Sequence, residues 1–278
     1  MMRRGTAWGA AVRRTDGTIE TTSRNLKAPT GLRQMPLVRG LFALVDSVML
    51  GTRATLWAAQ TRGGADGSDY HPAGLALTVT IAMVAVLGIF GIFPGAAVKW
   101  MGVENIFLFS LIEGLIRLVI LVGYLLLLGR SAQVKRVFAY HGAEHMTIHA
   151  FEHRAPLEAE SIRGFDRRHP RCGTAFLIVV VMVTIVAHTF IGNPSWTLLI
   201  ASRVLGLPVV AGIAYEAIRF AGRHQDSLIG KVLMAPGSWL QTITTAEPSD
   251  DMIEVAIRAL EATLAAETMN HDRAAHGA

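Results

Sequence analysis

Four long runs of apolar residues dominate the pattern of hydrophobic and polar positions along the chain. The first reads LALTVTIAMVAVLGIFGIFPGAAV, and no residue between positions 70 and 98 carries a formal charge. About 20 apolar residues in a helix are enough to span the hydrocarbon core of a bilayer. The pattern therefore predicts four transmembrane helices, at residues 75–98, 105–128, 174–191 and 196–220.

The remaining segments show the periodicities of surface helices and of a short hairpin. AAVRRTDGTIET, at residues 10–21, holds two strand-like runs around Asp16-Gly17, a dipeptide typical of hairpin turns. Residues 35–60 predict an amphipathic helix on the membrane surface or beneath the bundle. We expect PGSWLQ, at 236–241, to form a loop near the interface. A further amphipathic helix is predicted to begin at Asp250 or Asp251.

Together these elements predict an all-α polytopic membrane protein with a small N-terminal β-hairpin. We expect residues 1–69 to form a cytoplasmic segment with the hairpin and one amphipathic helix. Residues 70–220 would form the four-span membrane domain, with a histidine-rich cytoplasmic loop at 129–173. Residues 221–278 would form a second cytoplasmic segment with its own amphipathic helix.

The charge distribution supports membrane insertion and predicts an orientation. Charged residues make up 17% of the 278 positions and apolar residues 51%, with a net charge of +5. Ten Lys and Arg precede the first run, eight lie in the loop at 129–173 and four follow the last run. Because basic residues stay on the cytoplasmic side, both termini and that loop are predicted to be cytoplasmic. Attraction to anionic lipid accounts for the excess of basic over acidic residues, so we expect no nucleic-acid partner.

The loop between the second and third runs contains the residues best suited to chemistry, within YHGAEHMTIHAFEHR at 140–154. His141 and His145 lie one helical turn apart, so both imidazoles can reach one metal ion. Glu144 lies on the adjacent flank, as a third ligand or a general base. Glu152 is too far along the helix to share that shell and is expected to orient a ligand. We interpret His149 and His153 as a solvated polar face.

The same loop ends in HPRCGT, directly before the third apolar run. His169 and Cys172 could fold back onto the helix and complete a His₃Cys metal site with His141 and His145. The alternative for Cys172, the single cysteine of the chain, is a small apolar filler.

Ionisable residues inside the apolar runs form a second candidate constellation. Glu113 and Arg117 lie one turn apart in the second run, and Arg203 and Glu216 lie in the fourth. Charged side chains inside the hydrocarbon core are energetically unfavourable, so their presence there suggests a function. They predict either an ion-pair network that fixes helix packing or a polar cavity. We interpret His188 as a helix-contact residue.

Several of these segments resemble the YqhQ-type family of bacterial membrane proteins, which is described as metal-dependent. The resemblance runs nearly end to end and rests on RVFAYHGAEH at 136–145, HPRCGT at 169–174 and PGSWLQTITTAEPSDD at 236–251. It implies a bacterial cell membrane location and site positions at His141, Glu144, His145, Glu152, Arg171 and Cys172, and His169 also matches. Arg171 would contact the metal ligands without binding the metal itself. Met146 replaces the family's usual lysine, and a family stretch containing a glutamate precedes the position of Met1.

Three classes of function follow from these residues. The first is a hydrolase-like enzyme with a divalent metal ion, zinc being expected, and a lipid-soluble or membrane-associated substrate. His141-Gly-Ala-Glu144-His145 also fits the H-x-x-E-H pattern of zinc peptidases, so a peptidase is an alternative hypothesis within this class. The second class is a metal-stabilised scaffold or assembly factor. The third is an ion or small-solute carrier, for which four spans would require a homo-oligomer.

Overall fold

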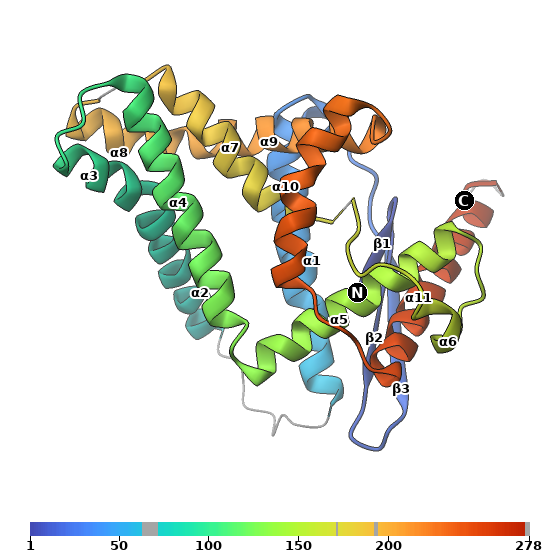
Figure 1. The fold of residues 1–278 in the computed structure, drawn as a ribbon. Coiled ribbons are helices and arrows are strands. Elements are labelled where there is room, and N and C mark those ends of the chain that lie inside the picture. Colours follow the sequence, from blue (N-terminus) through green and yellow to red (C-terminus); the bar gives the residue numbers. More distant parts are fainter. Residues whose placement is uncertain (63–71, 171, 192–193, 276–278) are drawn as a thin grey trace.

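A computed structural model describes residues 1–62, 72–170, 172–191 and 194–275, and it is mostly helical with one small sheet (Figure 1). Helices gather at one side of the molecule, and the sheet lies at the other beside the C-terminal helix. The strands are β1 (Met2–Arg4), β2 (Ala7–Arg13) and β3 (Ile19–Asn25). The longer helices are α1 (Val38–Thr61), α2 (Pro72–Val86), α4 (Ile106–Leu128), α5 (Ala132–Glu152), α7 (Ala175–Thr189), α8 (Trp196–Leu205), α9 (Leu207–Arg223), α10 (Leu228–Thr244) and α11 (Asp250–Ala275). The shorter helical elements are η1 (Gly31–Gln34), the π-helical η2 (Leu87–Ile92), α3 (Phe93–Trp100) and α6 (Ala159–Ile162).

The N-terminal sheet is antiparallel with the order β1-β2-β3. The predicted turn is confirmed: β2 pairs with β3, and Asp16 Oδ1 accepts a hydrogen bond of 2.9 Å from the Thr18 backbone. The prediction of a two-stranded hairpin was incomplete, because β1 adds a third strand on β2. Its three residues are too few to show an alternating pattern in the sequence.

Helices cover both faces of the sheet at β2, where successive residues point to opposite faces. Trp8 and Ala10 pack on Leu50 and Ala54 of α1. On the opposite face α11 approaches so closely that a Cβ added at Gly9 would lie 2.6 Å from Thr263 Oγ1. The amphipathic helix predicted from Asp250 is confirmed as α11. Its apolar face packs on β1 and α5 through Met2, Met146, Ile253, Ile257 and Leu260. This packing holds α5 against α11.

Within the described residues, three helices are long and apolar enough to cross a membrane: α1, the continuous stretch Leu77–Trp100, and α4. A fourth is added if the bent pair of α8 and α9 is one span. The stretch Leu77–Trp100 and α4 coincide with the predicted runs 75–98 and 105–128. The other two predicted spans are less regular. α7 has only 15 residues, and the run 196–220 is divided into α8 and α9, which are bent by 47° at Gly206. Pro208 in the first turn of α9 lacks the backbone N–H that a continuous helix would use there.

Two segments differ from the sequence-based expectations. The helix predicted for residues 35–60 is present as α1, but its length and hydropathy make it a candidate span rather than only a surface helix. The prediction of a loop at PGSWLQ was wrong, because Pro236 and Gly237 lie inside α10. Gly237 is needed for the packing of α10 on α7, since a Cβ there would lie 2.4 Å from Ala175 Cβ.

Gly114 sets the close approach of α4 to α7. A Cβ at this position would lie 2.2 Å from Ile185 Cγ1, whereas a Cβ at Gly123 on the same helix meets nothing within 4 Å. We expect Gly114→Ala to lower the free energy of unfolding by about 1–3 kcal/mol through overpacking. Gly123→Ala should instead raise it by about 0.5–1 kcal/mol through helix propensity. Thermal unfolding of both variants in one detergent measures the difference, and equal shifts would contradict the predicted contact.

Candidate metal centre

Helix α5 presents His141 and His145 on one face, with ring centroids 4.3 Å apart. The linker between α10 and α11 crosses this helix: the backbone N–H of Ala246 donates to the Phe138 carbonyl at 2.9 Å. Gly142 permits the crossing, since a Cβ there would lie 2.3 Å from the Ala246 carbonyl oxygen. The crossing places a backbone carbonyl from the end of α10 beside His141.

Backbone carbonyls orient both imidazoles. His141 Nδ1 lies 2.9 Å from the Thr244 carbonyl oxygen, and His145 Nδ1 lies 2.7 Å from that of Arg167. A carbonyl only accepts, so each Nδ1 carries the hydrogen. In the neutral imidazoles the lone pair is therefore on Nε2. This is the usual arrangement for metal-binding histidines, whose second nitrogen is held by an outer partner.

Cys172 meets these imidazoles from the segment before α7. Its Sγ lies 3.2 Å from His141 Nε2 and 3.1 Å from Thr174 Oγ1, and it accepts from the Thr174 backbone N–H at 3.4 Å. One donor atom each from His141, His145 and Cys172 lies within 4.8 Å of the others. Donor atoms around a tetrahedral zinc are about 3.3–3.8 Å apart, so small side-chain movements would close the set.

The electrostatics of this group favour a thiolate. Burial alone would raise the pKa of Cys172, but the hydrogen bonds and positive charge of His141 and His145 outweigh burial and lower it to about 5. Burial lowers the pKa of His141, yet the contact with Cys172 outweighs burial, and the pKa is raised. A metal ion binds thiolate and neutral imidazole, so a cation would replace the proton shared by this pair.

His169 is separated from this group. Its ring centroid lies 5.8 Å from that of His145 but 4.7 Å from that of His149. Its Nε2 lies 3.4 Å from Glu152 Oε2, and His149, Glu152 and His169 form a second set of donor atoms within 4.8 Å of one another. The single His₃Cys set expected from the sequence is thus divided into two neighbouring groups. Burial and then the charge of His149 lower the pKa of His169 to about 4.

Three further site residues have different outcomes. Among the described residues, Glu144 lies outside both donor groups, and one of its oxygens is 3.8 Å from the Met1 nitrogen. Arg171 lies outside the described residues. His149 was interpreted as part of a solvated face, but its side chain joins the second donor group. Its spacing from His145 and Glu152, four and three residues, was the signal in the sequence.

Both groups adjoin one cavity of about 880 Å³. Its walls come from α1, α5, the segment before α7, the N-terminal residues up to Arg4 and α11. The chemistry-bearing side chains that line it are His141, Glu144, His145, Glu152, His169 and Cys172. A ligand in this cavity would therefore contact the imidazoles, the thiol and two carboxylates together.

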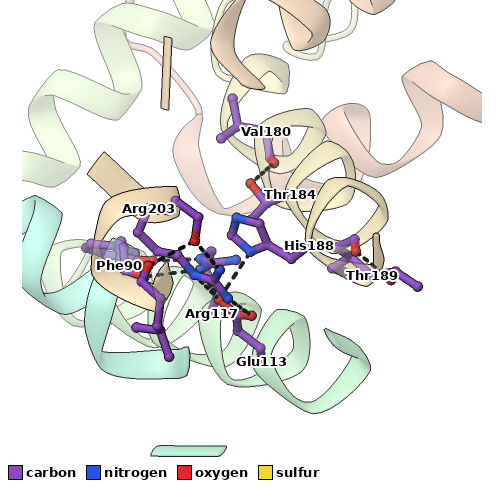
Figure 2. Close-up of polar contacts among 12 residues, drawn as sticks. Phe90, Glu113, Arg117, Val180, Thr184, His188, Thr189 and Arg203 are labelled. Carbon is purple, nitrogen blue, oxygen red and sulfur yellow. Dashed lines mark hydrogen bonds and ion pairs between the residues drawn. The ribbon is translucent and has the colours of Figure 1, made fainter. Parts of the chain in front are cut away.

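The ionisable residues of the apolar helices form a separate, buried cluster around Glu113 (Figure 2). Arg203 donates to Glu113 at 2.5 and 3.1 Å, and Arg117 donates to it at 2.9 Å. Arg117 also donates to the Phe90 carbonyl in η2 at 2.6 Å. His188 Nδ1 lies 3.3 Å from Glu113. These contacts favour the expected ion-pair network.

Glu216 does not join that cluster. It is half-buried, and Arg39 of α1 donates to it at 2.6 Å from Nε and again from Nη2. The backbone of Leu37 also lies 3.4 Å from the same carboxylate. Glu216 therefore joins α1 to α9, and the four ionisable residues of the predicted spans form two separate ion-pair sites.

Comparisons with known proteins agree with the resemblance seen in the sequence motifs. Residues 35–266 match the family described as "Protein of unknown function (DUF1385)". The chain is 32% identical over 279 residues to the "Uncharacterized protein YqhQ" of Bacillus subtilis (strain 168), with 94% of this chain and 87% of the relative covered. No solved structure matches the chain.

Proposed function

We propose that this chain, which belongs to the DUF1385 family, is a metal-dependent integral membrane enzyme of the hydrolase type. The observation that carries the proposal is the convergence of His141, His145 and Cys172 beside the cavity. Three protein ligands with space for a fourth are typical of catalytic zinc sites, whereas structural sites use four protein ligands. That difference favours the enzyme over the metal-stabilised scaffold.

The chemistry of the donor set fits a divalent ion, with zinc as the preferred candidate. Two imidazole nitrogens and one thiolate are ligands that zinc accepts, and the Thr244 and Arg167 carbonyls hold both imidazoles in the required tautomer. When bound, such an ion lowers the pKa of a coordinated water towards 7 and polarises a carbonyl or phosphoryl oxygen.

Glu144 is our candidate for the general base. It lines the same cavity as the three donors, follows His141 by three residues on α5, and lies outside the donor group among the described residues. A carboxylate so placed can take a proton from water held in the cavity. The proposed role of Glu144 is therefore to move a proton.

The exposed surface of the helices supports insertion into a membrane. Leu77, Ile81, Met83 and Val84 on α2 are each about 60% exposed, and α4 exposes Leu111, Leu115 and Val119 to a similar extent. Apolar patches of this size are unfavourable in water. We propose a multi-pass protein of the bacterial cell membrane with both termini cytoplasmic, following the distribution of basic residues. This orientation requires an even number of crossings, so the candidate spans, α1 included, do not all cross in this proposal.

The position of the site suggests how a substrate reaches it. Only two residues separate Cys172 from the start of α7, so the cavity would lie at the cytoplasmic end of the bundle in the proposed orientation. A membrane-associated substrate could enter from the lipid interface. The carrier alternative is less well supported, because Glu113 is held by two guanidinium groups inside the bundle.

Replacement of Glu144 tests the proposed reaction. We expect Glu144→Gln to keep bound zinc and to lower zinc-dependent hydrolysis by about 10²- to 10⁴-fold, the usual contribution of a general base. The measurement uses purified full-length protein in lipid nanodiscs with chromogenic carboxylic esters, thioesters and phosphate esters. Glu261→Gln, on the exposed side of α11, is the control.

Two outcomes would count against this function. Wild-type protein loaded with zinc could fail to hydrolyse every probe, which would favour the scaffold. Alternatively, the Glu144→Gln variant could keep the full rate, which would remove Glu144 from the reaction.

A further inference from the structure

The second donor group continues the first along the same helix. His141 and His145 are followed on α5 by His149 and Glu152, and the segment before α7 contributes Cys172 to one group and His169 to the other. Each group thus takes two side chains from α5 and one from that segment. The two groups are consecutive on one wall, since the rings of His145 and His169 lie 5.8 Å apart.

Backbone carbonyls also orient the second group. His149 Nε2 lies 2.9 Å from the Arg168 carbonyl oxygen, directly after the Arg167 carbonyl that binds His145 Nδ1 at 2.7 Å. The Arg168 carbonyl only accepts, so Nε2 of His149 carries the hydrogen. In the neutral ring the lone pair is then on Nδ1. Consecutive carbonyls of one segment therefore set the tautomers of a histidine in each group.

His169 is fixed by its backbone as well as by its burial. Its N–H donates to Gln241 Oε1 at 2.7 Å, and its carbonyl accepts from Gln241 Nε2 at 3.0 Å. Gln241 is fully buried in α10, and the His169 residue is 4% exposed. The imidazole is thus held beside Glu152 by the bundle itself. Such support is what a preorganised ligand requires.

We propose that His149, Glu152 and His169 bind a second divalent cation beside the first. Two imidazole nitrogens and one carboxylate oxygen suit a first-row divalent ion, and the carboxylate supplies a negative charge comparable to that of the thiolate in the first group. His149 and Glu152 are more exposed than His145 and Cys172. We therefore expect the second ion to exchange faster and to bind more weakly. This inference deepens the proposed function and rests on its assignment of this cavity wall to metal binding.

Cobalt titration of metal-free, full-length protein in detergent distinguishes the two ions. A cobalt–thiolate bond gives a charge-transfer band, whereas a site with only nitrogen and oxygen ligands changes the ligand-field bands alone. Wild-type protein should bind two equivalents, and the charge-transfer band should be complete after the first. His149→Ala should bind one equivalent with that band unchanged.

Two variants control for indirect effects. Glu152→Gln keeps the size of the side chain and should weaken only the second equivalent by at least about tenfold. His153→Ala removes a neighbouring histidine outside both donor groups, so this variant should still bind two equivalents.

The outcomes separate this inference from the proposed function. One equivalent in wild type with the charge-transfer band would overturn the second site and leave the first. Two equivalents in His149→Ala would also overturn it. Cobalt that binds without any charge-transfer band, and is lost in His149→Ala, would support the second site and overturn the thiolate centre of the proposed function.

Discussion

Replacing both His141 and His145 by alanine is expected to weaken zinc binding at the thiolate centre by more than about a hundredfold. Even changes in the outer partners of metal ligands cost about 10- to 100-fold in affinity. The double variant removes two of the three donors themselves and leaves Cys172 alone. Zinc competition with a chelator of known affinity measures the change, and the cobalt–thiolate band should disappear in parallel.

His153→Ala is the matched control for that experiment. His153 directly follows the last residue of α5 and lies outside both donor groups, with its Nδ1 2.8 Å from the His149 carbonyl oxygen. This variant should bind zinc as the wild type does. Equal zinc affinity in the double variant and in wild type would rule out a metal centre at these residues.

The Glu113→Ala variant is expected to lose about 3–5 kcal/mol of unfolding free energy, since one partner of a buried ion-pair network is removed. Arg203 and Arg117 would then lie together inside the bundle without the carboxylate that accepts from both. Glu113 is 1% exposed and Arg203 4%, so water can replace little of the lost interaction. Thermal and denaturant unfolding in detergent measure the loss.

Glu216→Ala provides the comparison for this variant. Its partner is also an arginine, but the Glu216 and Arg39 side chains are 25% and 23% exposed. A pair with that access to solvent contributes about 0–1 kcal/mol. The network interpretation requires the Glu113 variant to be clearly the less stable of the two. A Glu113→Ala protein as stable as Glu216→Ala would instead support a hydrated polar cavity around Arg117 and Arg203.

The local elements could be predicted from the sequence because they depend on short-range patterns. Asp16-Gly17 determines a turn within a few residues, and the apolar runs at 75–98 and 105–128 form helices whatever surrounds them. The strand at Met2–Arg4 could not be predicted in this way. It exists through pairing with β2 and packing on α11, a helix near the other end of the chain.

The same limit applies to the candidate site. Four-residue spacing predicted that His141 and His145 share a helix face, and the structure brings Cys172 to them. The three-residue spacing of His169 and Cys172 could not predict that they join different donor groups, because side chains of an irregular segment can point in any direction. That division follows from the two hydrogen bonds between His169 and Gln241 of α10, 72 positions away.

The sequence by itself determined the long apolar helices, the hairpin turn and the one-turn spacing of the α5 histidines, because each depends on neighbouring residues alone. Only the tertiary structure decided which distant groups meet. It joins Glu113 to Arg203 across 90 positions, Arg39 to Glu216 across 177, and His141 to the Thr244 carbonyl across 103. Such partners are selected by the packing of whole helices, where glycines such as Gly142 and Gly237 allow close approach. That packing is a property of the complete fold, and no local pattern in the chain encodes it separately.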